Sequence, residues 1–202
     1  ETVFDIDTGT ANVAPDGSPY SGFREEIMLI DEVDNVISRP FFLPRIATES
    51  LTNVITNSTT LVENDSLGVT LTIRPYSARN PDGSYFTGQA SVSEVPLALA
   101  PAALPADLEP GMLVTIQPVG VRFNPPALIT FPNIDELPPG TEVNLWSLDP
   151  DTGTFIVVGV LRVSADGSVL ETISGGIIAA DWHAPLPRNP EGDGEMNNDE
   201  NQ

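Results

Sequence analysis

The sequence has no cysteine, no lysine and few aromatic residues, and it contains a single histidine. The lack of cysteine excludes disulfides, thiolate metal ligands and cysteine nucleophiles. Aromatic residues make up 6% of the 202 residues, which leaves few flat side chains on which a sugar could stack. His183 is therefore the one imidazole available as a general base.

Positive charge is scarce as well. Twenty-nine acidic residues face eight basic ones, all arginine, and the formal net charge is −21. Such a surface repels phosphate backbones and anionic lipid headgroups, so we expect neither nucleic-acid binding nor membrane docking. No apolar run is long enough to span a membrane. The expected partners are other protein domains or copies of the same chain, at an extracellular or cell-surface location.

The residues that are abundant point to strands and turns. Proline (20) and glycine (16) are frequent, and in GVTLTI the residues Val69, Leu71 and Ile73 fall on one face of a strand. Between residues 142 and 173, three strand-like runs are joined by the tight turns DPDTG and ADG, which predicts an antiparallel meander. The expected fold is an all-β, antiparallel two-layer β-sandwich with little helix.

Three regions are predicted along the chain. Residues 1–47 alternate short apolar runs with turns, as in N-terminal strands, and residues 48–183 form the sandwich. Within it, MLVTIQPVGVRF (112–123) and FNPPALITFPN (123–133) are expected to be two successive strands bounded by proline. Residues 184–202 are polar and acidic and are predicted to be a tail or linker.

One segment carries a family resemblance. In QPVGVRFNPPALITFP (117–132), Pro118, Gly120, Phe123 and Pro126 precede alternating apolar residues. This pattern resembles the ZU-type β-sandwich shared by tight-junction proteins, netrin receptors and ankyrins. It also looks like bacterial modules of very large surface proteins, where similar segments follow, here residues 137–159, 163–168 and 175–183. The resemblance spans roughly residues 60–183.

The resemblance implies a protein–protein or scaffold role, without catalysis in most members. In the similar bacterial modules, the preceding residues commonly join the sandwich to a carboxypeptidase-regulatory-like β domain. By that resemblance, residues 1–47 include part of such a junction.

Two acidic turns are the candidates for a metal site. Asp149 and Asp151 in DPDTG, and Asp5 and Asp7 in FDIDTGT, have the D-x-D-x-G spacing of a calcium loop. Calcium takes six to eight oxygen ligands, and the closing glutamate of a twelve-residue loop is missing after both turns. A plain acidic hairpin turn uses the same residues. These four aspartates are therefore candidates for weak calcium binding, and no other cofactor is expected.

No catalytic residue is predicted. His183 follows Asp181 and Trp182, but no G-x-S-x-G nucleophile elbow is present. We expect Trp182 to close the last strand against the core and His183 to sit where the strand leaves it.

These observations predict a non-enzymatic extracellular structural or adhesion module that presents a rigid acidic β surface. The alternative is a self-assembling subunit of an extracellular filament, in which TVFDIDTG (2–9) completes the sheet of a neighbour, assisted by calcium.

Overall fold

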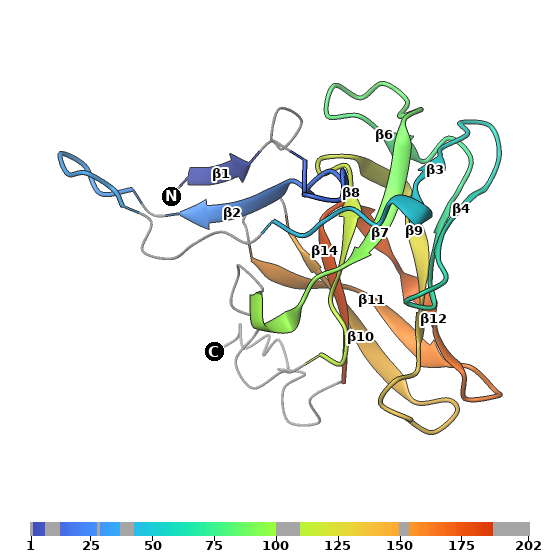
Figure 1. Cartoon of the computed structure of the whole chain (residues 1–202). Helices are drawn as coiled ribbons and strands as arrows, with labels where there is room; N and C mark the ends of the chain where they lie inside the picture. The colour runs from blue at the N-terminus through green and yellow to red at the C-terminus, as the bar shows by residue number, and fades with distance from the viewer. Residues whose placement is uncertain are drawn as a thin grey trace, which may run out of the picture.

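The computed structural model describes residues 2–6, 13–27, 29–36, 43–99, 110–149 and 154–187. These residues form strands joined by turns, with two short 3-10 helices, so the predicted all-β architecture with little helix is confirmed (Figure 1). The strands are β1 (Thr2–Ile6), β2 (Phe23–Ile27), β3 (Thr52–Asn53), β4 (Thr60–Asn64), β5 (Val69–Ile73), β6 (Ala78–Arg79), β7 (Gln89–Glu94), β8 (Val114–Gln117), β9 (Arg122–Pro132), β10 (Glu142–Leu148), β11 (Phe155–Val163), β12 (Val169–Gly175), β13 (Ile177–Ala179) and β14 (Trp182–Pro187). The helices are η1 (Thr48–Ser50) and η2 (Leu97–Leu99).

Twelve of these strands make one antiparallel sheet. Its order is β3-β7-β8-β14-β10-β11-β12-β9-β5-β4, and β6 and β13 also pair with β9. The two ends of this order meet, because β4 packs beside β3 and β7. The sheet is thus nearly closed into a barrel, and its facing layers are opposite walls of one curved sheet (Figure 1).

The strand periodicity predicted from the sequence is observed in the walls. In β5, Val69, Leu71 and Ile73 are buried while the threonines between them are half-buried. Leu71 lies opposite Ile129 of β9, which is also buried. Alternate side chains from each wall therefore fill the barrel interior.

The predicted meander is present as β10, β11 and β12, with antiparallel neighbours. The ladder is irregular at two places, between Leu145 and Trp146 in β10 and between Val160 and Leu161 in β11. Such bulges increase local twist and bend a sheet. They help this part of the sheet to curve around the core.

The predicted strand boundary at Phe123 is wrong. β8 ends at Gln117, Gly120 makes the bend with a φ of +91°, and β9 then runs without a break through Pro125 and Pro126. These prolines are tolerated because β6 and β13 pair with β9 on either side of them, at Arg122, Phe123 and Ala127. Phe123 itself is buried in the core.

The N-terminal strands lie outside the barrel. β1 and β2 form a two-stranded antiparallel sheet that pairs with no strand of the barrel. The chain after β1 is tied down at Tyr20, which bridges Arg45, and at Gly22. The Gly22 backbone donates to the Gln117 side chain (3.2 Å) and accepts from it (3.3 Å).

The predicted start of the tail at residue 184 is also wrong. β14 continues to Pro187, and Ala184 and Leu186 are fully buried. Pro185 fits in this strand because β8 pairs with β14 only at Trp182 and His183, so beyond that point β10 is the one neighbouring strand. Residues 188–202 are outside the described part of the chain.

Trp182 anchors a second, smaller core. It is fully buried with Val95, Leu113, Leu148 and Ala184, as predicted for the residue that closes the last strand. Among the described residues, no helix has the length and apolar character needed to cross a bilayer.

Candidate functional site

The acidic turn DPDTG begins directly after β10. The backbone N–H of Asp149 donates to the carbonyl oxygen of Thr154 (2.8 Å), which closes the turn. Asp5 lies within β1, opposite Arg24, whereas Asp7 and Asp151 fall outside the described residues. In the described ranges, no three or more acidic or histidine side chains are grouped as a metal would require. The calcium site therefore stays a prediction.

Three other acidic turns share one sequence, Asp-Gly-Ser, and one geometry. In each, Oδ1 of the aspartate accepts hydrogen bonds from both the backbone N–H and the hydroxyl of the serine two residues on. The glycine between them has a φ near +80°, which a side chain would strain. The turns are Asp16–Ser18, Asp82–Ser84 and Asp166–Ser168. The repeated Asp-Gly-Ser tripeptide is the sequence pattern from which this shared turn geometry can be predicted.

These hydrogen bonds stabilise the charged form of each carboxylate. The serine hydroxyls and backbone N–H groups lower the pKa of Asp16 and of Asp82 below its usual value. At Asp166 the pKa falls to about 2, because the hydroxyl of Ser164 also donates to the same oxygen (2.6 Å). Oδ1 of each carboxylate is thus used by its own turn, and Oδ2 of Asp16 also pairs with Arg45 (2.8 Å). These aspartates therefore stabilise the turns of the fold.

His183 is sealed in the barrel wall. On β14 it lies between Val114 of β8 and Ser147 of β10, and its side chain is fully buried. Its Nε2 accepts a long hydrogen bond from the Asp181 backbone (3.4 Å), while its Nδ1 has no hydrogen-bond partner among the described residues.

Burial lowers the pKa of His183 to about 3 because the charged imidazolium would lose its hydration. The imidazole is therefore neutral near pH 7. The expectation that His183 sits at the exit of the strand is wrong, since the strand is covered on both sides at this residue.

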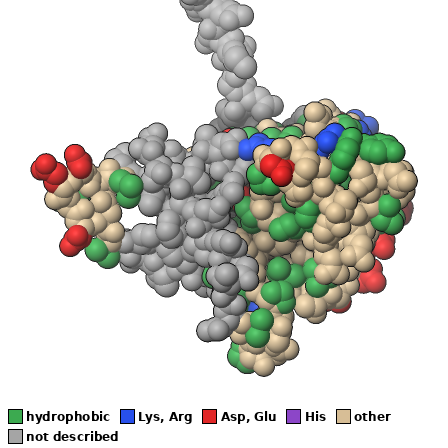
Figure 2. Space-filling view, turned by 90° about the horizontal axis from the view of Figure 1, so that it is seen from above, with side chains coloured by type: hydrophobic (Ala, Val, Ile, Leu, Met, Phe, Trp, Pro, Cys, Tyr) green, Lys and Arg blue, Asp and Glu red, His purple; other side chains and the backbone are tan. Residues whose placement is uncertain are grey.

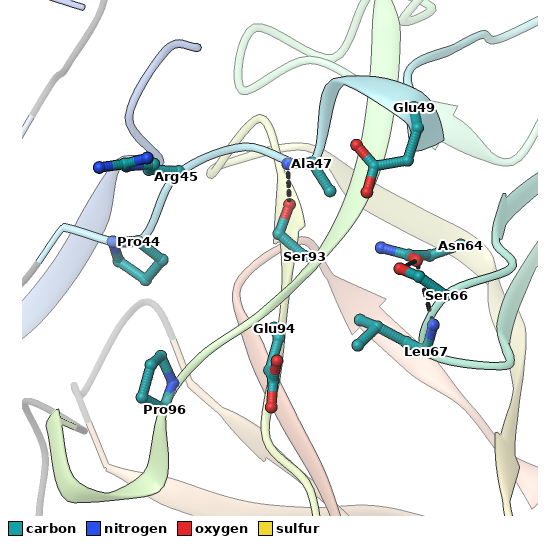
Figure 3. A pocket seen from close by; sticks show the side chains of 10 residues that line it. All are labelled: Pro44, Arg45, Ala47, Glu49, Asn64, Ser66, Leu67, Ser93, Glu94 and Pro96. Carbon is teal, nitrogen blue, oxygen red and sulfur yellow. Dashed lines mark hydrogen bonds between the residues drawn. The ribbon is translucent and has the colours of Figure 1, made fainter. Parts of the chain in front are cut away.

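A surface hollow is the candidate binding site. It has a volume of about 450 Å³ and lies where residues 44–49 run past the turn after β4 and the end of β7 (Figure 3). Its lining comprises Pro44, Arg45, Ala47, Glu49, Asn64, Ser66, Leu67, Ser93, Glu94 and Pro96. This hollow could not be predicted from the sequence, because its walls come from segments far apart in the chain.

The hollow combines acidic and apolar groups with one guanidinium, that of Arg45, which pairs with Asp16 (2.8 Å). Glu49 and Glu94 are exposed carboxylates, and Leu67 is a half-buried apolar contact. The hydroxyl of Ser93 accepts the backbone N–H of Ala47 (2.7 Å), so it holds the rim in place (Figure 3). This arrangement suits a basic side chain, whose aliphatic stem can lie on the apolar floor and whose charge can face the carboxylates.

Beside the hollow, two side chains close the barrel. β3 pairs with β7 only at Gln89 and Ala90. Further along β7, the backbone of Val92 therefore has no paired strand on the side of β4. The Val92 N–H donates to Oγ of Ser50 (3.1 Å), and its carbonyl oxygen accepts from Oγ of Ser50 (3.0 Å) and from Nδ2 of Asn64 (2.9 Å). We call this line of contact, made by Ser50, Asn64 and Val92, the seam.

Replacing Asn64 with leucine is expected to lower the free energy of unfolding by about 1–3 kcal/mol, because the buried Val92 carbonyl loses a donor. Chemical denaturation followed by tryptophan fluorescence measures the change. Asn57→Leu is the matched control, since Asn57 is exposed, and it should shift stability by less than about 0.5 kcal/mol. Equal effects of the two substitutions would contradict a closing role for Asn64.

We compared the chain with protein-family models, with curated proteins and with solved structures, and none of the three comparisons found a match. The resemblance to ZU-type domains therefore rests on the residues quoted above. The function has to be argued from the groups on the surface, since a β architecture alone does not define one.

Proposed function

We propose that the protein is a non-enzymatic extracellular structural or adhesion module whose rigid β surface contacts other proteins. The observation that carries this proposal is the complete burial of His183 in the barrel wall. A general base has to reach the proton that it removes, and this imidazole is fully buried and does not line the hollow.

The construction of the barrel supports a structural role. Its strands are antiparallel throughout, and one large apolar cluster continues across the walls. A packed β interior of this kind deforms little, which suits a spacer or a presenting scaffold. The net charge of −21 favours basic partners and a salty surrounding, and the hollow gives one place where a basic side chain of such a partner fits.

The alternative function is a filament subunit that exchanges strands. It is supported by the position of the β1–β2 sheet, which pairs with no strand of the barrel. β2 is the one strand paired with β1 among the described elements, so the other edge of β1 offers backbone groups to a neighbour. In this alternative, deleting residues 1–12 abolishes assembly.

Turnover assays and hydrogen exchange test the main proposal. We expect no hydrolysis of ester, glycoside or peptide substrates, and slow amide exchange across β9, β10, β11 and β12. Turnover that disappears in a His183→Gln variant would disprove the non-enzymatic role. Fast exchange across the barrel strands would disprove the rigid one.

A further inference from the structure

One loop projects away from the barrel and carries apolar side chains into solvent. Residues 29–36, which follow β2 and which we call the arm, include Leu29, Ile30, Val33 and Val36, with exposed fractions from 54% to 83%. Acidic side chains alternate with them at residues 31, 32 and 34. The arm forms the far end of the molecule in both views, and Figure 2 shows its red and green side chains together (Figures 1 and 2).

The arm has a defined shape although it is exposed. Oδ1 of Asn35 accepts the backbone N–H of Ile30 (2.7 Å), and its Nδ2 donates to the carbonyl oxygens of Ile30 (2.9 Å) and Val33 (3.0 Å). Glu32 at the tip adopts a left-handed conformation, with a φ of +60°. A loop held by its own asparagine loses little conformational freedom on binding.

A second exposed surface has the opposite charge. Residues Arg74, Tyr76, Arg79 and Tyr85, around β6, form what we call the arginine–tyrosine patch. The guanidinium of Arg79 lies 3.6 Å from the centre of the Tyr85 ring, and the Tyr76 and Tyr85 rings meet edge to face at 5.8 Å. Both tyrosines remain exposed, at 54% and 42%.

Two further features mark this patch. Tyr76 is a bulky residue with a φ of +59°, a conformation that is rare for such a side chain and that holds its ring at the surface. Arg122 of β9 lies opposite Arg79 in the ladder. Arg79 and Arg122 therefore lie side by side, and Arg74 is an exposed arginine two residues before Tyr76.

We propose that the arm of one copy docks on the arginine–tyrosine patch of a second copy. Its acidic residues complement the arginines, and its exposed apolar side chains match the tyrosine rings. The arm and β6 lie at opposite sides of the molecule (Figure 1), so the two surfaces do not meet within one chain. A contact between two different surfaces repeats from copy to copy, and it builds a ring or an open chain of molecules.

This inference goes beyond the proposed function and does not depend on strand exchange. The arm–patch contact uses side chains of residues 29–36, whereas strand exchange uses the backbone of β1. Deleting residues 1–12 is therefore expected to leave the arm–patch association in place.

Charge exchange between the two surfaces tests the inference. Sedimentation velocity over a range of concentrations should show reversible self-association of the wild-type chain that weakens in about 0.5 M salt. Arg74→Glu with Arg79→Glu, or Asp31→Arg with Asp34→Arg, should each weaken it about tenfold or more. A chain that carries all four substitutions should associate again, because the charges are complementary once more.

Two controls separate the docking contact from general charge or folding effects. Glu63→Arg with Glu171→Arg changes the same amount of charge at exposed barrel positions outside the arm, and it should leave the association unchanged. Asn35→Ala keeps every charge and apolar group of the arm, and it should still weaken association because the loop loses its shape. The inference is overturned if the wild-type chain stays monomeric, if the four-fold variant fails to recover, or if the Glu63 and Glu171 control weakens association equally.

Discussion

Replacing Gly175 with alanine is expected to lower the free energy of unfolding by at least about 3 kcal/mol. If the wild-type protein is only marginally stable, this loss abolishes cooperative folding. A Cβ at this position would collide with the carbonyl oxygen of Val158 and would lie 2.8 Å from Cα of Gly159 on the paired strand. Both partners are backbone atoms of β11, which cannot rotate away. The φ of +67° at Gly175 adds strain for any side chain.

Gly83→Ala is the matched control. Gly83 has a similar positive φ of +84°, but no heavy atom lies within 4 Å of a Cβ placed there. Gly83→Ala should lower the free energy of unfolding by only about 1 kcal/mol, the strain of a side chain at a positive φ. Denaturant titration of both variants measures the difference, and a Gly175→Ala protein as stable as Gly83→Ala would contradict the close approach of β11 and β12.

The second large effect concerns His183 and pH. The contribution of His183 to the free energy of unfolding is expected to fall as the pH drops below about 6.5, by up to about 1.4 kcal/mol per pH unit, and to level off near pH 3. The unfolded chain binds a proton at the usual histidine pKa, whereas the buried imidazole does not until its pKa of about 3 is reached. Between these values acid therefore favours the unfolded state.

A comparison with His183→Gln isolates this effect. Asp16, Asp82 and Asp166, whose pKa values are lowered by their turns, are present in both proteins, so the difference between the two pH profiles reports on the imidazole. The wild-type profile should be steeper between pH 6.5 and 3. Parallel profiles over that range would show that His183 titrates normally in the folded protein.

Local sequence patterns predicted the parts of the fold that local physics decides. Alternation in GVTLTI placed Val69, Leu71 and Ile73 on the buried face of β5, and the two tight turns after residue 142 produced the meander. The bend at Gly120 and the burial of Phe123 were also predictable. In each case, neighbouring residues along the chain carry the information.

Sequence patterns failed where the outcome depends on which strand lies alongside. The predicted boundaries at residues 123 and 184 are wrong because pairing with a neighbouring strand is interrupted beside the prolines: β6 and β13 pair with β9 at residues 122, 123 and 127, and β8 pairs with β14 only at residues 182 and 183. Burial of His183 depends on β8 and β10, which are distant in sequence. The hollow and the arginine–tyrosine patch are likewise assembled from separate segments, whereas the acidic and apolar alternation of the arm lies within one short stretch of sequence.

The seam has a consequence for how the barrel moves. A wall held by a backbone ladder opens only when several strand hydrogen bonds break together, whereas at Val92 the hydrogen bonds across the seam are made by two side chains, those of Ser50 and Asn64. Transient opening of the barrel should thus begin along this line, next to the hollow. A bulky basic group bound between Glu49 and Glu94 would lie next to this line and favour the open state. Binding in the hollow would then increase how often the barrel wall opens.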